Sequence, residues 1–171
     1  MVLISDILDL SKIESNTMEF NFCNISLHQV LNEIGSAQRM NMKEGVELLL
    51  DLPGQEITIA TDPTRLSQVI NNLVNNAIKF TSEGNICIGY RPATSNRVKI
   101  FVEDTGTGMA KEVIEHIFDR FYKGDAFKQG TGLGLAICRT IAERFKGKIE
   151  VASTPGKGTR FTIILPLKVE E

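Results

Sequence analysis

The sequence contains no tryptophan, only three cysteines and no long run of apolar residues. Cys23, Cys87 and Cys138 lie far apart and lack CxxC spacing, which excludes a disulfide framework and argues against a structural zinc site. No stretch reaches the roughly 18 apolar residues of a membrane-spanning helix, and the N-terminus lacks the pattern of a signal peptide. We therefore expect a cytoplasmic chain whose thiols are reduced.

The chain also lacks an excess of charge of either sign. It has 19 Lys and Arg against 21 Asp and Glu, a net charge of -2, and the two signs are mixed along the sequence. Together with the absence of tryptophan, this excludes the basic, aromatic surface that typically binds nucleic acid. The 171 residues, of which 42% are hydrophobic, suit one domain with its own core, so an anionic ligand would need a local site.

Two common phosphate-binding motifs are missing as well. No GxxxxGK[ST] sequence is present, which disfavours the P-loop class. The glycine-rich run Gly130, Gly132 and Gly134 has GxGxG spacing instead of GxGxxG, and no suitable strand leads directly into it. A Rossmann-type dinucleotide site is therefore disfavoured too.

Hydrophobic periodicity and turn signals predict both helices and strands. Helices are expected over residues 1–15, 27–43, 63–80, 111–121 and 133–145. Strands are expected over residues 18–24, 46–52, 56–60, 86–90, 97–103, 148–153 and 159–166. Because these elements do not alternate strictly as βαβ units, we expect an α+β fold, a two-layer sandwich with a mixed sheet and helices on one face. The first helix fits two interpretations equally well, a helix packed on its own domain or the cut end of a longer one.

The helix expected over residues 63–80 carries an unusual row of polar residues. Asn72 and Asn76 lie four positions apart on one face, with Lys79 near them, while Asn71 and Asn75 are offset around the helix. Asparagine is a weak helix former, so four of them need a compensating gain. Carboxamide oxygens suit Mg²⁺ bound to phosphates. The alternative is a solvated helix face.

A second cluster, Asp104, Gly106 and Gly108, directly follows the strand expected over residues 97–103. Glycines at alternate positions let the backbone turn sharply and approach a flat ligand closely. A carboxylate at the end of a strand can accept hydrogen bonds from an exocyclic amine. The alternative is a simple glycine-rich turn.

The third cluster is the glycine run over residues 130–134, at the start of the last expected helix. Its free N–H groups suit phosphate oxygens, because the helix dipole favours negative charge there. Between the second and third clusters, the aromatic residues Phe118, Phe121 and Tyr122 form an expected hydrophobic anchor. The following polar segment, with Lys123 and Lys128, fits either a mobile loop over phosphates or a plain surface loop.

Taken in order, these motifs resemble the N, G1, F and G2 boxes of bacterial sensor histidine kinases. They read Asn72-x-x-x-Asn76-Ala, Asp104-x-Gly106-x-Gly108, Phe118-x-x-Phe121-Tyr122 and Gly130-Thr-Gly132-Leu-Gly134-Leu. Residues 4–14 also resemble the end of the second helix of the family's dimerisation and phosphotransfer domain. The resemblance implies that residues 1–15 end that helix and that residues 16–171 form a catalytic ATP-binding domain of the Bergerat fold.

The resemblance implies ATP and Mg²⁺ as cofactors and assigns a role to each motif. Asn76 would coordinate Mg²⁺, with Asn72 and Lys79 near the phosphates, and Asp104 would bind the adenine amino group. Gly106 and Gly108 would shape the base pocket. The remaining ATP-binding positions, at the lid and its borders, would be Tyr122, Lys123, Gly130, Thr131, Gly132, Leu133 and Gly134. Lys123 stands where many family members carry a phosphate-contacting arginine, and lysine offers no planar fork.

The family phosphorylates a histidine in a His-Glu or His-Asp motif, and neither histidine of this chain lies in one. His28 and His116 are therefore expected to be packing or surface residues. The resemblance implies transfer of the γ-phosphate to a histidine on the phosphotransfer domain of the same protein, through which the parent would be homodimeric. A response regulator receiver domain would act downstream, without direct contact to nucleic acid. Membrane-anchored and unanchored parent proteins both stay open.

Two other function classes share this nucleotide fold. ATPases of the chaperone, mismatch-repair and gyrase type carry a glutamate one turn before the metal-binding asparagine, whereas here that position is Asn72, which cannot act as a general base. A domain that only binds nucleotide is the other alternative. The intact Asn72, Asn76 and Asp104 argue against it.

Overall fold

The structure of the chain is a computed structural model that describes residues 2–122 and 132–168. Its helices are α1 (Val2–Glu14), α2 (Leu27–Arg39), α3 (Pro63–Phe80), α4 (Lys111–Ile114) and α5 (Gly134–Arg144). Its strands are β1 (Cys23–Ser26), β2 (Val46–Asp51), β3 (Thr58–Thr61), β4 (Gly84–Ala93), β5 (Arg97–Asp104), β6 (Lys148–Thr154) and β7 (Gly158–Pro166). None of the helices in this part of the chain is long and apolar enough to cross a membrane.

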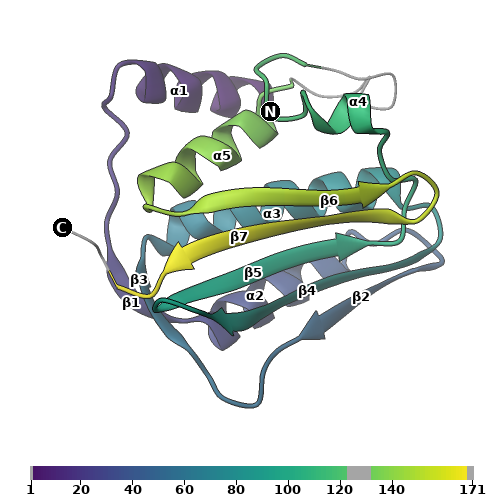
Figure 1. Cartoon of the computed structure of the whole chain (residues 1–171), viewed down its shortest axis with the longest axis horizontal. Helices are drawn as coiled ribbons and strands as arrows, with labels where there is room; N and C mark the ends of the chain where they lie inside the picture. Colours follow the sequence, from purple (N-terminus) through teal and green to yellow (C-terminus); the bar gives the residue numbers. More distant parts are fainter. Residues whose placement is uncertain (1, 123–131, 169–171) are drawn as a thin grey trace.

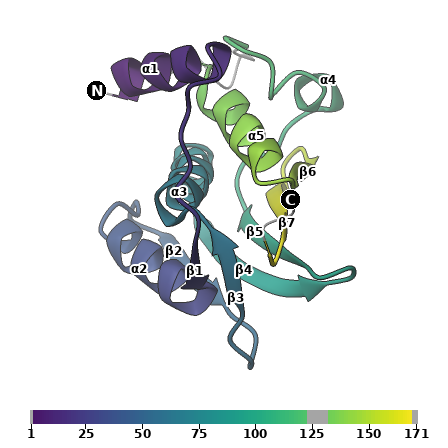
Figure 2. The same ribbon diagram turned by 90° about the vertical axis from the view of Figure 1, so that its left-hand side faces the viewer.

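The main sheet has five strands in the order β2-β4-β5-β7-β6. Strand β2 pairs with β4 in parallel, and the other pairs are antiparallel, so the sheet is mixed. Helices α2, α3 and α5 cover one of its faces, and α1 lies beyond α5 (Figure 1, Figure 2). A separate antiparallel pair joins β1 to β3. The predicted α+β sandwich with helices on one face is confirmed.

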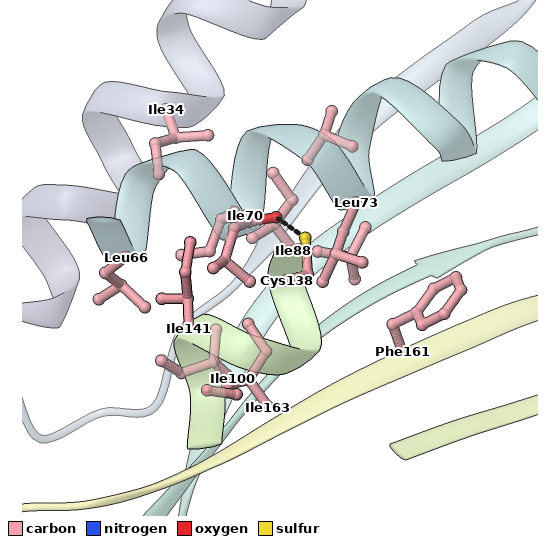
Figure 3. Packing of buried hydrophobic residues seen from close by; sticks show 14 of the residues in the cluster. Ile34, Leu66, Ile70, Leu73, Ile88, Ile100, Cys138, Ile141, Phe161 and Ile163 are labelled. Carbon is pink, nitrogen blue, oxygen red and sulfur yellow. Dashed lines mark hydrogen bonds between the residues drawn. The ribbon is translucent and has the colours of Figure 1, made fainter. Parts of the chain in front are cut away.

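Helix α3 is the centre of the helical layer and spans the predicted residues. Asp62 caps its start by accepting hydrogen bonds from the N–H groups of Thr64 (2.9 Å) and Arg65 (3.1 Å), and Pro63 occupies the first turn. Its apolar face, from Leu66 to Ala77, is buried. Figure 3 shows this face packed between α5 and the sheet, which fixes the direction of the helix's polar side chains.

The strand predicted over residues 18–24 is wrong in its first part, because β1 begins only at Cys23. Phe20 and Phe22 instead contact the ring of Phe145, with centroid distances of 5.5 and 5.8 Å. The N–H of Asn21 donates to the carboxylate of Asp62 (2.9 Å) and not to a neighbouring strand. The alternating apolar residues thus fill an aromatic cluster outside the sheet.

The helix predicted over residues 111–121 is also wrong in its length. Helix α4 ends at Ile114, and the N–H groups of His116 and Asp119 each bond to a carbonyl three residues earlier, as in successive turns. Phe121 has a φ of 62°, which an α-helix cannot contain. Phe118 meanwhile reaches the ring of Phe161 at 6.3 Å, so the expected hydrophobic anchor is made by a turning chain.

Helix α1 packs with its polar side inward. Asp6 and Asp9 are only 5% and 7% exposed, whereas Ile4, Ile7 and Leu8 are 61%, 50% and 56% exposed. The carboxylate of Asp9 accepts hydrogen bonds from Gln68 Nε2 (2.6 Å) and an Arg65 Nη (3.3 Å) on α3. The helix therefore attaches to the domain through the polar contacts of Asp9 and the packing of Leu10 and Ile13 on the core, and it presents Ile4, Ile7 and Leu8 outward.

Candidate functional site

The four asparagines of α3 point in different directions. Gln38, a buried residue of α2, donates through Nε2 to Asn71 Oδ1 (2.9 Å) and to Asn75 Oδ1 (3.3 Å). These two asparagines therefore connect α3 to α2 and satisfy a buried amide. Asn72 and Asn76 face elsewhere, as their four-residue spacing predicts.

Asn72 lies between α3 and the start of α5. Its Nδ2 donates to Cys138 Sγ at 3.7 Å, and that thiol lies 3.8 Å from the Val69 carbonyl oxygen (Figure 3). Burial raises the pKa of Cys138 to about 12, so the group is a neutral thiol. A Cβ placed on Gly134 would lie 3.9 Å from Asn72 Nδ2. Asn72 thus stands beside the N-terminus of α5.

Asn76, one turn further along α3, lines a hollow whose volume, counted together with the open solvent at its mouth, is about 330 Å³. The other residues that line it are Phe80, Asp104, Gly108, Met109, Thr159 and Phe161. The walls of the hollow are mostly apolar, and its prominent polar side chains are the carboxamide of Asn76 and the carboxylate of Asp104. Such a pocket suits a planar heterocycle that carries a few polar groups.

Asp104 ends β5 and is 8% exposed. Its Oδ1 accepts hydrogen bonds from the N–H groups of Gly106 (2.8 Å) and Thr159 (3.3 Å). Burial raises the pKa of this carboxyl above its ordinary value, and the two hydrogen bonds oppose that shift. Within the described residues, Oδ2 accepts no hydrogen bond, so it is available to a donor in the pocket.

The glycines after Asp104 allow close approach between backbone segments. A Cβ on Gly106 would overlap the carbonyl oxygen of Phe80, to which the N–H of Thr107 donates at 3.1 Å. Gly108 has a φ of 68°, and a Cβ there would overlap the Thr154 carbonyl oxygen. The sequence analysis expected close approach to a ligand. The structure shows in addition that Gly106 and Gly108 let the loop after β5 pack closely against the end of α3 and the end of β6.

Replacing Gly106 with alanine should destabilise the fold and weaken nucleotide binding together. The added methyl group would push the loop away from Phe80, and such overpacking typically costs about 1–3 kcal/mol. Urea denaturation of the two proteins measures the loss in free energy of unfolding. Gly54→Ala is the matched control, because a Cβ on Gly54 meets nothing within 4 Å. Equal stability of the two variants would contradict the steric argument.

Gly132 is fixed by contact with Phe121. It has a φ of 74°, its added Cβ would lie 2.8 Å from the Phe121 backbone, and its carbonyl accepts the Phe121 N–H at 2.9 Å. Tyr122 lies next in the chain, with its ring centroid 5.4 Å from that of His116. Leu133 is fully buried in the core. The predicted site residues Lys123, Gly130 and Thr131 lie outside the described residues.

Lys79 lies next to the pocket. Its Nζ is 5.6 Å from the centroid of the Phe80 ring, which lines the hollow. The two histidines lie elsewhere. His28 Nδ1 hydrogen-bonds the hydroxyl of buried Tyr90, and the exposed His116 contacts Asp119 at 2.9 Å.

Sequence reasoning missed four residues of the pocket, namely Phe80, Met109, Thr159 and Phe161. Thr159 and Phe161 belong to β7, whose register places Thr159 opposite Asp104. That pairing joins residues far apart in the chain, and no local pattern indicates it. The turn glycines before Thr159 signal a hairpin but not its neighbour.

A family model described as "Histidine kinase-, DNA gyrase B-, and HSP90-like ATPase" matches residues 61–169. Sensor histidine kinase RcsC of Escherichia coli (strain K12) is 39% identical over 172 residues, which cover 96% of this chain and 18% of RcsC. Sensor histidine kinase WalK of Bacillus subtilis (strain 168) is 33% identical over 175 residues, which cover 99% of this chain and 29% of WalK. The chain thus spans less than a third of the length of either relative.

Solved structures of histidine kinases are also similar to this chain. Full-length ShkA in complex with AMPPNP superposes with a TM-score of 0.90 at 27% identity, covering 99% of this chain and 36% of ShkA. The catalytic domain of histidine kinase ThkA superposes with a TM-score of 0.76 at 30% identity, covering 88% of this chain and 97% of that domain.

Proposed function

The chain belongs to the family of histidine kinase-, DNA gyrase B- and HSP90-like ATPases and is the ATP-binding catalytic domain of a sensor histidine kinase. We propose that it binds and uses ATP in the following way. The adenine lies in the pocket at Asp104, and the phosphates lie toward Asn72 and the start of α5. The γ-phosphate passes to a histidine on the phosphotransfer domain of the parent protein.

The observation that carries this proposal is the hydrogen bonding of Asp104. Two backbone N–H groups hold Oδ1, while Oδ2 accepts no hydrogen bond within the described residues. An exocyclic amine supplies the donor that this oxygen lacks. The rings of Phe80 and Phe161, with Met109, supply apolar walls for the base.

The start of α5 supports the placement of the phosphates. Its N-cap residue Leu133 makes no side-chain capping hydrogen bond, and the first N–H to bond back within the helix is that of Ile137. Within the described residues, the N–H groups of Gly134, Leu135 and Ala136 bond to no backbone carbonyl, so they are available to phosphate oxygens at the end of the helix that favours negative charge. Gly134 leaves room there beside Asn72.

The residues of the pocket fit Mg²⁺ that arrives with the nucleotide. No group of three or more His, Cys, Asp or Glu residues that could hold a metal ion occurs among the described residues. Asn76 offers one neutral oxygen donor, and Mg²⁺ commonly combines few protein ligands with phosphates and water. When bound, the ion neutralises phosphate charge, and Asn76 is the residue that would hold it.

The outward face of α1 supports the proposed division of the chain. The exposed stripe of Ile4, Ile7 and Leu8 suits packing against another helix, as a bundle of the phosphotransfer domain would provide. Residues 1–15 are then the end of that domain, and residues 16–171 are the catalytic domain. A response regulator receiver domain is the proposed downstream partner.

Phosphotransfer in trans tests the proposal. The chain is mixed with Mg-ATP labelled in the γ-phosphate and with the parent's phosphotransfer domain, and we expect an acid-labile, base-stable label on that domain's histidine. Without that domain, phosphate release should be negligible, because Asn72 cannot act as a base for water. Steady ATP hydrolysis by the chain alone would favour the chaperone or gyrase class. Nucleotide binding without transfer would favour a binding-only domain.

A further inference from the structure

A second hollow lies at the opposite end of β5 and β7 from the nucleotide pocket. Its volume is about 900 Å³, part of it open to solvent. The hollow is lined by Ala93, Thr94, Arg97, Lys99, Lys146, Gly147, Lys148, Glu150 and Ile164. These residues come from the β4–β5 turn, the α5–β6 turn and the adjoining strands, which lie at the same end of the sheet (Figure 1). We call this feature the basic groove.

Among the described residues that line it, the basic groove gathers four cations and one carboxylate. Glu150 pairs with Lys148 at 3.0 Å, whereas Lys99 and Lys146 form no ion pair with any described residue. Arg97 donates to the Lys146 carbonyl at 3.2 Å and so joins the two turns. The chain as a whole carries a net charge of -2, so this positive charge is a local feature.

The floor of the basic groove is apolar and set by strand register. Lys99 on β5 and Lys148 on β6 both pair with Ile164 on β7, so their side chains flank Ile164 on one face of the sheet. Gly147 brings the α5–β6 turn down onto β7, because a Cβ there would overlap the Ile164 carbonyl oxygen. Basic side chains therefore border Ile164, which is 7% exposed.

Lys146 keeps a charged side chain where the backbone favours glycine. Its φ is 64°, and the turn after α5 has the Schellman pattern, in which Lys146 N–H bonds Glu143 O (3.0 Å) and Gly147 N–H bonds Ala142 O (2.9 Å). A left-handed conformation costs a non-glycine residue conformational free energy. Attraction of a cation to the helix C-terminus returns only part of that cost. The remaining cost points to a use for this side chain.

We propose that the basic groove binds an extended acidic segment of a partner protein. The carboxylates of such a segment would meet Lys99, Lys146 and Lys148, and an apolar side chain would lie on Ile164. A concave site with an apolar floor suits a polypeptide better than a flat membrane surface. None of the described residues that line it is aromatic, so they offer no stacking surface of the kind found in single-stranded nucleic acid sites.

Fluorescence anisotropy with a labelled peptide of repeated Glu-Glu-Leu units tests the proposal. We expect salt-sensitive binding, no binding of the matching Gln-Gln-Leu peptide, and about tenfold weaker binding by the variant Lys99→Ala/Lys146→Ala. The control Lys12→Ala/Lys43→Ala makes the same charge change at exposed positions outside the groove and should bind normally.

Lys146→Gly separates binding from folding. Glycine relieves the left-handed backbone, so thermal stability should rise while affinity for the acidic peptide falls. Unchanged affinity of this variant would overturn the proposal, as would equal weakening by the Lys12/Lys43 control. Absence of peptide binding, or binding only to vesicles of phosphatidylcholine and phosphatidylglycerol, would overturn it as well. The groove variants Lys99→Ala/Lys146→Ala and Lys146→Gly change no residue that lines the nucleotide pocket, so ATP binding should persist in both.

Discussion

Replacing Asn76 with alanine should abolish magnesium-dependent ATP binding, while the same replacement of Asn75 should leave binding intact. Asn76 lines the nucleotide pocket and supplies its proposed metal-binding oxygen. The side chain of Asn75 is instead hydrogen-bonded to Gln38 on the α2 side of the helix. Because loss of a mere supporting residue typically costs about 10–100-fold in metal affinity, loss of the ligand itself should cost at least about 100-fold.

Calorimetric titration with ATP, in magnesium and in excess chelator, measures this effect. Both variants replace a weak helix former with the best one, so neither should unfold α3. Weakened binding in magnesium but not in chelator assigns Asn76 to the metal. Equal weakening under both conditions would instead mean that Asn76 contacts the base or the phosphates directly. Normal binding by the Asn76 variant would contradict its place in the site.

The sequence predicted α3 to the residue because its signals are local. The apolar residues from Leu66 to Ala77 keep a helical period, and Asp62 and Pro63 mark the start. All of these cues act within one or two helical turns. The start of α2 is local in the same way, because the side chain of Ser26 accepts the N–H of Gln29 at its first turn.

The predictions failed where distant residues decide the structure. The alternation over residues 18–24 indicates a strand, but Phe20 and Phe22 pack on Phe145, more than a hundred residues away. The sequence also left open how the first helix packs, and the partners of Asp9 on α3 turn Asp9 inward. Periodicity identifies two faces of a helix but not which of them the rest of the chain covers.

In the nucleotide site, too, local motifs were predicted correctly and contacts between distant residues were not. Motif spacing indicated Asn76, Asp104 and Gly108, and the structure brings these three into one pocket. Thr159 and Phe161 complete it only because β7 pairs with β5. Spacing separated Asn72 and Asn76 from Asn71 and Asn75, but the role of the second pair depends on Gln38, a residue of another helix.

Replacing Asp104 with asparagine should weaken nucleotide binding and stabilise the empty fold at neutral pH. The N–H groups of Gly106 and Thr159 require an oxygen at Oδ1, so the new NH₂ group would occupy the Oδ2 position and meet the exocyclic amine, donor against donor. Loss of a hydrogen bond to a charged group typically costs about 1.5–3 kcal/mol, or about 10–150-fold in affinity.

The stability effect follows from the raised pKa of Asp104. Burial raises this pKa in the folded state, so the folded protein binds the proton more tightly than the unfolded chain does. The group therefore favours folding at low pH, and this contribution is lost as pH rises through the raised pKa. Asparagine is neutral at every pH, so the variant should unfold at higher urea at neutral pH. The difference should shrink below the ordinary pKa of 3.8, where both forms are uncharged.

Glu103→Gln is the matched control, because it removes the neighbouring carboxylate, which lies 3.7 Å from an Arg160 Nη in an exposed ion pair. It should change neither nucleotide affinity nor stability by much. If Asp104→Asn instead lowered stability, the two hydrogen bonds would outweigh burial and the charge would be structural. If Asp104→Asn instead raises stability and lowers nucleotide affinity, the buried charge of Asp104 destabilises the fold and is kept because nucleotide binding requires it.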